Sequence, residues 1–389
     1  MRAGKLVFAQ VMAHLPLHEL RRCVGRYHGH HKVKRFSCLD QFLCMAFAQL
    51  TYRESLRDIE TCLRAQSSKL YHMGFRAHIA RSTLAKANEV RDWRIHADLA
   101  QALIRIARRL YAGDDFGVEL EQTVYALDST LIDLTLSVFP WAPYLYSRAA
   151  IKLHTLLDLR GPIPGFIHIS DSKLADVHVL DLLIPEPGAV YVMDRGYLDF
   201  ARLHALHAAG AIFVIRDRAN TKFRRRYSHR VDRASGLICD QTIVLCGQYT
   251  GQTYPAPLRR IRYRDPETAQ TLVLLTNSRT IPANSITELY RRRWQIELFF
   301  KWIKQHLRIK AFYGISENAV RTQIWIAVAV YVLVAIVKKR LDLNASLYTI
   351  LQVLSLTCFE KTPIAQLVPT PVPISDRSIP HNQLELFTD

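Results

Sequence analysis

The sequence predicts an α/β protein in which an N-terminal all-α domain precedes a mixed five-stranded sheet flanked by helices. Three observations predict this class. Apolar residues recur at helical spacing over most of residues 1–115, short β-rich runs begin near residue 123, and helical patterns alternate with buried strands from about residue 176. A basic, β-rich insertion at 218–283 interrupts this alternation before helices resume.

The composition indicates a folded protein with a polyanionic partner. Its 389 residues are 49% hydrophobic, enough for two or three domains with packed cores. Lys and Arg number 52 against 34 Asp and Glu, and the formal net charge of +18 is spread along most of the chain. Nucleic acid is therefore the first partner to expect.

Cysteine usage and hydropathy indicate the compartment. The 7 cysteines include no CxxC pair, which predicts free thiols in a reducing environment rather than disulfides or a zinc ribbon. The longest apolar run, residues 324–337, is shorter than the roughly 18 residues of a membrane span. We therefore expect a cytoplasmic protein, associated with the nucleoid through its DNA, in which this run is a buried helix and no membrane is a partner.

Residues 1–115 are predicted to form a helical DNA-binding domain. The segments ESLRDIETCLRA and ARSTLAKANEVRDW are compatible with a helix-turn-helix whose second helix is capped by Ser82 or Thr83. An ordinary packed helical pair explains the same pattern. The sequence leaves both interpretations open.

The strand patterns predict one particular order of strands. Three consecutive β-rich runs indicate an antiparallel meander, and two buried strands then alternate with helical segments, which is the order of a ribonuclease H-like sheet. A helix over 285–307 is predicted to begin with a capping box formed by Ser285 and Glu288. The β-rich runs and buried strands cover residues 123–134, 149–159, 165–170, 189–196 and 211–217. The predicted divisions are a first core part at 116–217, the insertion at 218–283, a second core part at 284–342 and a C-terminal tail at 343–389.

Three carboxylates are the candidate catalytic and metal-binding residues. Asp128 lies in an otherwise apolar strand, where a charge is costly unless something compensates it, and Asp194 ends a buried strand. Functional groups collect at the carboxyl ends of parallel strands, and the helix that carries Glu297 can pack across them. Clustered carboxylates favour two Mg²⁺ ions, which Mn²⁺ can replace, about 3.5 to 4 Å apart for phosphodiester chemistry.

The helix around Glu297 is predicted to have a functional face and a packing face. At about 100° per residue, Tyr290, Arg293, Glu297 and Lys304 share one narrow face. An adjoining apolar stripe is suited to docking the helix on the sheet. The stripe consists of Leu289, Ile296, Phe300, Ile303 and Leu307. We expect the carboxylate to hold metal and the cations beside it to hold phosphate.

This spacing carries a family resemblance. Tyr-x2-Arg-x3-Glu-x6-Lys at 290–304 resembles the signature of the IS-four family of bacterial insertion-sequence transposases, and Asp128 in LDST and Asp194 in MDRGY look like that family's first and second catalytic aspartates. The resemblance implies a DDE transposase. Such an enzyme binds the inverted terminal repeats of its element as a homodimer on double-stranded DNA, nicks each end and joins the freed 3′-hydroxyl to target DNA. Tyr290, Arg293 and Lys304 would hold the terminal phosphates.

The insertion departs from the family in one respect. Some relatives stack a flipped base on a tryptophan there, but no Trp lies in 218–283, so Tyr227, Tyr249 or Tyr254 would have to substitute during hairpin formation. Six insertion arginines are predicted to contact the DNA backbone, with a solvated basic face as the alternative. They are Arg224, Arg225, Arg226, Arg259, Arg260 and Arg262.

Two other functions remain compatible with the sequence. A degenerate, catalytically inactive copy would only bind terminal repeats and repress transposition, but it would not need all three carboxylates. A ribonuclease H-like nuclease without strand transfer would use the carboxylates but leaves the Tyr, Arg and Lys spacing unexplained.

Overall fold

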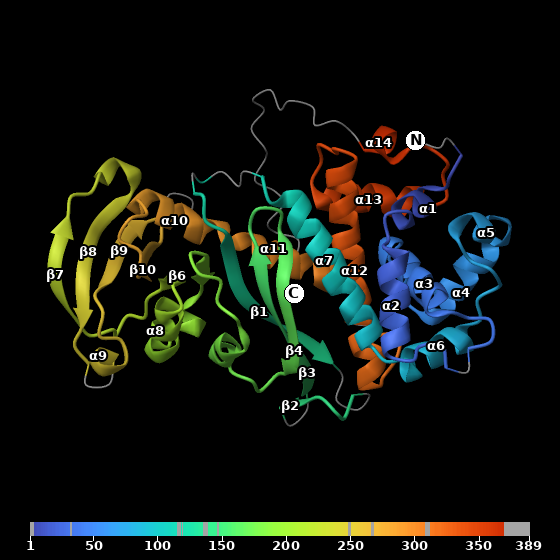
Figure 1. The fold of residues 1–389 in the computed structure, drawn as a ribbon, viewed down its shortest axis with the longest axis horizontal. Helices are drawn as coiled ribbons and strands as arrows, with labels where there is room; N and C mark the ends of the chain where they lie inside the picture. The colour runs from blue at the N-terminus through green and yellow to red at the C-terminus, as the bar shows by residue number, and fades with distance from the viewer. Residues whose placement is uncertain are drawn as a thin grey trace.

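The molecule has a helical half and a sheet half, which lie at opposite ends of its long axis in the computed structural model (Figure 1). The structure describes residues 4–31, 33–114, 118, 120–134, 139–145, 148–247, 250–265, 268–307 and 312–368. A mixed α/β protein with an N-terminal helical region is thus confirmed.

The N-terminal region is built of α-helices, as the apolar spacing predicted. Its α-helices are α1 (Val7–Met12), α2 (Leu17–Arg26), α3 (Cys38–Leu50), α4 (Leu56–Ala65), α5 (Leu70–Met73), α6 (Arg81–Val90) and α7 (Arg94–Tyr111). A 3₁₀ turn, η1 (Ser67–Lys69), precedes α5. The predicted cap on α6 is wrong, because this helix begins at Arg81 after Ala80 and has no side-chain cap, so that Ser82 and Thr83 lie inside its first turn.

One long apolar helix holds the two halves together. Helix α12 (Glu317–Arg340) packs against α7, α3 and α6 in the helical half and against α11 beside the sheet. It is long and apolar enough to cross a membrane, but 94% of its most apolar window is buried inside the protein. The predicted buried helix is confirmed, and it is longer than the apolar run because charged ends at Glu317 and Arg340 extend it into solvent.

The C-terminal segment returns to the N-terminus. Helices α13 (Leu347–Thr357) and α14 (Ile364–Leu367) follow α12, and Val7 N donates a 2.8 Å hydrogen bond to Glu360 O. The weak pattern of residues 343–389 did not predict these helices. The residues beyond 368 lie outside the described part of the chain.

The strands that the structure describes form one ten-stranded mixed sheet. The order of neighbouring strands across the sheet is β2-β3-β1-β5-β6-β10-β9-β8-β7. Strand β4 also pairs with β3, along a stretch that follows the one paired with β2. The predicted meander is confirmed, because β3 is antiparallel to both β1 and β4, while β5 and β6 run parallel to β1. The strands of this half are β1 (Val124–Leu134), β2 (Pro143–Leu145), β3 (Arg148–Asp158), β4 (Ile163–Asp171), β5 (Val190–Met193) and β6 (Ile212–Arg216).

The β-rich insertion extends the same sheet. Strand β10 (Thr271–Thr276) pairs antiparallel with β6, and β9 (Leu258–Arg264), β8 (Leu237–Leu245) and β7 (Phe223–His229) follow in order to the sheet edge. The predicted hairpin around the DPET turn is present as β9 and β10, although Pro266 and Glu267 lie outside the described residues. The described insertion also contains the short elements η4 (Arg233–Ser235) and α9 (Thr250–Thr253), and helix α10 (Ala283–Arg292) follows it.

Alternate residues of the central strands serve two different cores. Val124 and Ala126 belong to the core that contains α7, α11 and α12, whereas Tyr125 and Leu127 belong to a second core beneath α8 (Phe200–Ala208). This is the two-residue period of a strand buried on both faces. Two 3₁₀ segments, η2 (Asp176–Leu182) and η3 (Arg195–Tyr197), lie on the second face. Asp128 and Asp194, continuing the even-numbered series, are therefore directed towards α11.

The predicted helix over 285–307 is two helices. Helix α10 begins at Ala283 after Pro282, without a side-chain cap, so the capping box at Ser285 is wrong; Glu288 instead pairs with Arg291 and Arg292. Helix α11 (Trp294–Leu307) begins after a break at Arg293. At the break, Arg293 N donates to Tyr290 O and Ile296 N to Arg293 O, and these i to i−3 hydrogen bonds tighten the backbone.

Candidate active site

The two strand aspartates follow directly on the last paired residues of two neighbouring parallel strands. Strands β1 and β5 are paired up to Leu127 and Met193, so Asp128 and Asp194 are the next residue of each. Both side chains therefore lie where the strands separate, at the carboxyl end of the parallel part of the sheet. The predicted adjacency of these strands is confirmed.

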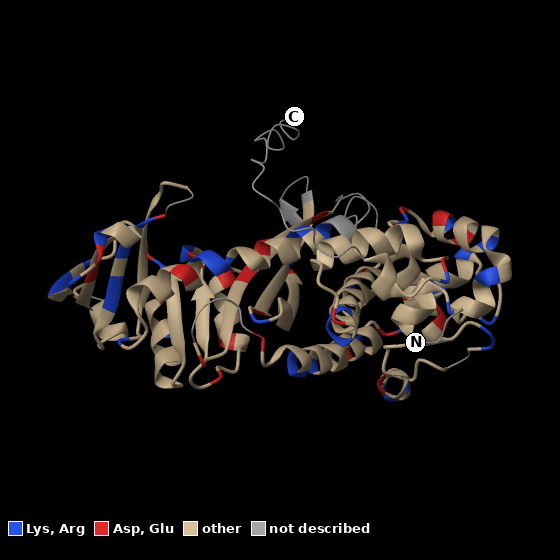
Figure 2. Cartoon of the chain, turned by 90° about the horizontal axis from the view of Figure 1, so that it is seen from above, with Lys and Arg blue, Asp and Glu red and all other residues tan. Residues whose placement is uncertain are grey.

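Arg293 brings the third carboxylate to this place. Its Nη1 donates to Asp128 Oδ2 at 2.7 Å and its Nη2 to Glu297 Oε1 at 2.5 Å. Tyr290, one turn earlier, directs its hydroxyl to Asp194 Oδ1 at 3.4 Å. Residues from β1, α10 and α11 and the residue that follows β5 thus lie close together. Figure 2 shows stretches of acidic and basic residues close together along the ribbon of the sheet half.

The packing face of the two helices is arranged as predicted. Leu289, Ile296, Phe300 and Ile303 are all buried in the core beneath the sheet, whereas Lys304 is exposed. The side chain of Leu307 lies outside the described set. This apolar stripe presses α11 onto β1 and so holds Glu297 beside the strand ends.

The surroundings of Asp128 shift the pKa of its carboxyl group. Burial raises its pKa to about 6; the Arg293 guanidinium and the backbone N–H of Ser129 oppose this shift, and Glu297 and Asp194 add to it. Burial also raises the pKa of the Tyr290 hydroxyl, which stays protonated. Three carboxylates of the site therefore lie near one shared guanidinium, that of Arg293.

The donor chemistry fits a hard divalent cation. Asp128 and Glu297 are close enough to share one cation, since a single guanidinium contacts both, and Asp194 lies beside them. All three supply the carboxylate oxygens that Mg²⁺ and Mn²⁺ prefer. Within the described ranges no three His, Cys, Asp or Glu side chains are already arranged to hold a metal ion, and the Arg293 guanidinium lies between Asp128 and Glu297.

One cation of the site was missed in the sequence. Arg216 ends β6, whose Ile215 is paired with Met193, so Arg216 lies beside Asp194 at the next strand end. Its charge acts on the Tyr290 hydroxyl and lowers the pKa of that group. The signal was available, since Arg216 follows the buried run AIFVI in the same way that Asp194 follows AVYVM.

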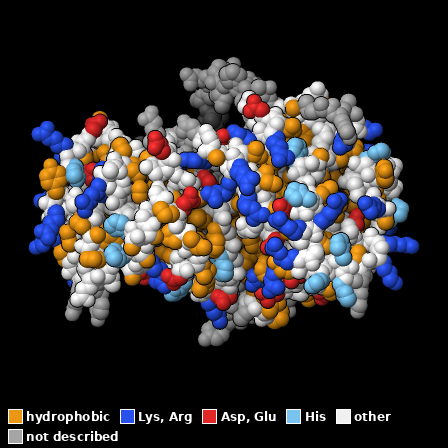
Figure 3. All heavy atoms as spheres, in the orientation of Figure 1, with side chains coloured by type: hydrophobic (Ala, Val, Ile, Leu, Met, Phe, Trp, Pro, Cys, Tyr) orange, Lys and Arg blue, Asp and Glu red, His pale blue; other side chains and the backbone are white. Residues whose placement is uncertain are grey.

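The insertion arginines divide into two groups. Arg259 is buried in a bidentate pair with Asp240, and Arg260 lies 3.8 Å from Asp217 and stacks on the Phe223 ring. Both have carboxylate partners within the sheet, and their contact with DNA stays a prediction. The exposed group consists of Arg224, Arg225, Arg226 and Arg262. Figure 3 shows Lys and Arg side chains at the β7 end of the molecule.

The candidate stacking tyrosines likewise differ in their exposure. Tyr254 is fully buried with its hydroxyl 2.7 Å from His207 Nδ1, so it cannot receive a base. Tyr249 lies outside the described residues. Tyr227 on the edge strand β7 is 62% exposed, so of the two that the structure describes it is the one open to stacking.

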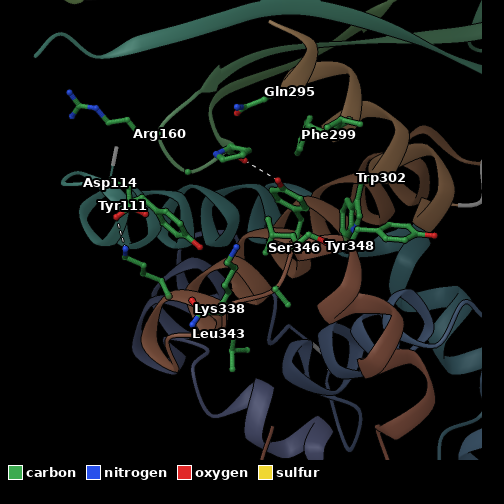
Figure 4. A pocket seen from close by; sticks show the side chains of 18 of the residues that line it. Tyr111, Asp114, Arg160, Gln295, Phe299, Trp302, Lys338, Leu343, Ser346 and Tyr348 are labelled. Carbon is green, nitrogen blue, oxygen red and sulfur yellow. Dashed lines mark hydrogen bonds and ion pairs between the residues drawn. The ribbon is translucent and has the colours of Figure 1, made fainter. Parts of the chain in front are cut away.

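A cavity of about 1230 Å³ lies on another side of α11 (Figure 4). Phe299 and Trp302 of α11 line it together with Tyr331 and Lys338 of α12, and Lys339 at its edge is paired with Asp114. Asp128, Asp194 and Glu297 do not line this cavity. The carboxylate site is instead an open seam between the sheet and the helices.

Comparison with known proteins agrees with this geometry. Residues 119–333, more than half of the chain, match a family model described as a transposase DDE domain, and residues 3–76 match a domain of unknown function, DUF4372. The chain is 32% identical to a putative transposase, y4zB, of Sinorhizobium fredii over 64% of this chain and 71% of that protein.

Two further relatives are described as probable or putative transposases. A probable transposase for insertion sequence element IS5377 of Geobacillus stearothermophilus is 30% identical over 53% of this chain and 54% of its own length. A putative transposase for insertion sequence element IS4SA of Synechocystis is 40% identical over 12% of this chain and 14% of its own. The cryo-EM structure of a piggyBac transposase synaptic complex with hairpin DNA has a TM-score of 0.47 and 10% identity, over 96% of this chain and 89% of that one. By its matched domain and its relatives, this chain belongs to the DDE transposases of bacterial insertion sequences.

Proposed function

We propose that this protein binds the inverted terminal repeats of an insertion sequence, cleaves DNA at each end in a metal-dependent reaction and transfers the ends into target DNA. The observation that carries the proposal is the convergence of three carboxylates at the strand ends: Arg293 contacts Asp128 and Glu297, and Tyr290, one turn before Arg293, directs its hydroxyl to Asp194. A buried structural ion pair needs one carboxylate for one guanidinium. Here one guanidinium is shared by two carboxylates and a third acts on one of them, an arrangement that suits cation-assisted chemistry.

The strand order supports a ribonuclease H-like core. In the order β4-β3-β1-β5-β6, three strands are antiparallel neighbours and the last two are parallel to β1. The insertion leaves the core after β6 and returns before α10, between Asp194 and Glu297. This is the interval in which the family resemblance places an insertion.

Asp128, Asp194 and Glu297 would hold two Mg²⁺ ions, or Mn²⁺ in their place. When bound, such ions activate a water or 3′-hydroxyl and stabilise the leaving oxygen of a phosphodiester. For this the Arg293 guanidinium must leave the space between Asp128 and Glu297. A terminal DNA phosphate is a suitable new partner for it, because guanidinium binds phosphate in the same bidentate manner as carboxylate.

The other residues of the face would position DNA. The Tyr290 hydroxyl is a neutral donor beside Asp194, and Lys304 is exposed one and a half to two turns along α11 from Glu297. The exposed arginines of β7, Arg224, Arg225 and Arg226, extend the basic surface to the far edge of the sheet. We propose a homodimer on double-stranded DNA, located in the cytoplasm with the nucleoid.

One experiment separates the candidate functions. The protein is mixed with a labelled inverted-repeat end, Mg²⁺ and a target plasmid, and the products are resolved on denaturing gels. Joined product supports the transposase, nicking alone a nuclease, and a mobility shift without cleavage a repressor. Asp194→Asn should retain end binding within about twofold yet lose Mg²⁺-dependent nicking, because the amide keeps the shape but not the charge. Retained nicking would show that the site lies elsewhere.

A further inference from the structure

A second polar cluster lies on the opposite face of β1, directly behind Asp128. Ser129 points away from α11, and its Oγ donates to Asp176 Oδ1 at 2.6 Å. Lys152 Nζ lies 3.1 Å from the same oxygen, and His154 Nδ1 lies 3.8 Å from it. Asp176 is the first residue of η2, so a segment between β4 and β5 reaches across to the central strand.

The cluster is connected to the position of Asp128. The backbone N–H of Ser129 donates to Asp128 Oδ1 at 2.8 Å, so any movement of Ser129 changes the orientation of the carboxylate. The paired register of β1 and β5 ends at Leu127 and Met193, one residue earlier. Beyond that point β1 is held by β3 on one side only, and the hydrogen bond to Asp176 supplies a second attachment.

Asp176 also lies against the turn that follows Asp194. A Cβ built on Gly196 would meet Asp176 Oδ2 at 4.0 Å, and η2 and η3 are in contact. The Tyr197 side chain in this turn is buried; burial raises the pKa of its hydroxyl, and the charges of Asp128 and Asp176 raise it further. One carboxylate therefore contacts the segments that carry both strand aspartates.

The charge of Asp176 is already satisfied by protein groups. Lys152 is the nearest cation, and its ammonium also donates to Leu174 O at 2.8 Å, so it is fixed between η2 and β3. His154 is fully buried and uncharged near neutral pH, since burial lowers its pKa to about 4. A carboxylate anchored in this way supports its neighbours rather than serving as a further metal ligand.

We propose that Asp176 is a positioning residue for the cleavage reaction: it holds Ser129, whose N–H orients Asp128, and it braces the turn behind Asp194. The inference rests on the proposed function and adds to it a residue outside the catalytic face. Groups that orient a metal-binding carboxylate typically change metal affinity or activity 10- to 100-fold when removed.

The test compares Asp176→Ala with Ser129→Ala, with the double variant and with the wild type. Mn²⁺ binding is measured by electron paramagnetic resonance, nicking of a labelled end is followed as a function of Mg²⁺ concentration, and end binding is measured without metal. Asp176→Ala should weaken Mn²⁺ binding and raise the Mg²⁺ requirement by roughly 10- to 100-fold with unchanged end binding. The double variant should be little worse than either single one, because both remove the same hydrogen bond.

Two further variants keep the test decisive. Asp176→Asn preserves the shape and an acceptor for Ser129, so it should fold and recover part of the metal affinity. Asp181→Ala removes an exposed carboxylate of the same 3₁₀ segment that pairs with Arg202, and it should behave as wild type. Wild-type Mn²⁺ affinity in Asp176→Ala, or full additivity with Ser129→Ala, would overturn the role. A wild-type protein that neither binds Mn²⁺ nor nicks would overturn the proposed function and this role with it.

Discussion

Two arginine clusters in this molecule resemble each other locally but differ in charge balance. In the insertion, Arg259 donates to Asp240 through Nε at 2.8 Å and Nη2 at 2.6 Å, and the two side chains are 12% and 4% exposed. In the seam between the sheet and α11, Arg293 is shared by Asp128 and Glu297, and Asp194 lies beside them. The first cluster is a closed one-to-one pair, whereas in the second one guanidinium is shared by two more exposed carboxylates with a third beside them.

This difference separates a structural ion pair from a site. A closed one-to-one pair has no capacity for another ligand, and removing one partner leaves a buried charge. A guanidinium shared by several carboxylates is a replaceable counter-ion. The comparison therefore predicts that changes at Asp240 affect folding, and that changes around Arg293 affect metal binding and chemistry.

The largest expected effect is at Glu297. Glu297→Gln should lower the rate of Mg²⁺-dependent nicking by roughly 10³-fold or more, because an amide supplies no negative charge to a divalent ion. The rate is measured on a labelled terminal-repeat end in single-turnover conditions. Glu288→Gln on α10, which breaks only the pairs with Arg291 and Arg292, is the matched control and should nick normally. Equal loss in both variants would contradict the assignment.

The next effect is on stability and belongs to the insertion. Asp240→Asn should lower the free energy of unfolding by about 3 kcal/mol, because it leaves the Arg259 charge buried without its partner. Urea unfolding followed by circular dichroism measures the change. Replacing both residues, Asp240→Leu with Arg259→Met, should recover most of the loss. If Asp240→Asn protein is still folded but no longer nicks DNA, the pair with Arg259 is not purely structural.

The pH dependence should come from the seam. The pKa of Asp128 is raised to about 6, so this carboxyl is ionised above that pH and increasingly protonated below it. At limiting Mg²⁺, nicking should fall about tenfold from pH 7.5 to pH 5 with a one-proton slope. Saturating Mg²⁺ should shift the midpoint to lower pH, because metal competes with the proton. A midpoint that does not respond to Mg²⁺ would exclude Asp128 as the titrating ligand.

The smallest expected effect tests whether Arg293 is a replaceable counter-ion. Arg293→Ala should bind Mn²⁺ about fivefold more tightly in the absence of DNA, since a partly exposed ion pair is worth up to about 1 kcal/mol. Electron paramagnetic resonance measures the concentration of free Mn²⁺, from which the affinity is obtained. Arg292→Ala, whose partner is Glu288, should leave the affinity unchanged. Weaker Mn²⁺ binding in Arg293→Ala would instead mean that the guanidinium orders the carboxylates.

Much of the site was predictable because it depends on local patterns. The buried runs ending at Met193 and Ile215 indicated strands, the charge of Asp128 in an apolar strand marked it as a candidate, and the Tyr-x2-Arg-x3-Glu-x6-Lys spacing placed four residues on one face. Element boundaries were less certain. The predicted cap at Ser285 is absent because the helix begins two residues earlier, at Ala283. The predicted continuous helix is interrupted at Arg293.

The sequence by itself determined the helical N-terminal region, the strands, the basic charge and the three candidate carboxylates, because periodicity and composition report which side chains must be buried. Only the tertiary structure decided which arginines are already neutralised. Arg293 and Asp128 are 165 residues apart in the chain, whereas Arg259 and Asp240 are 19 apart on paired strands, and no local pattern distinguishes the two. Charge partners depend on strand register and helix docking, which form only when distant segments share a core.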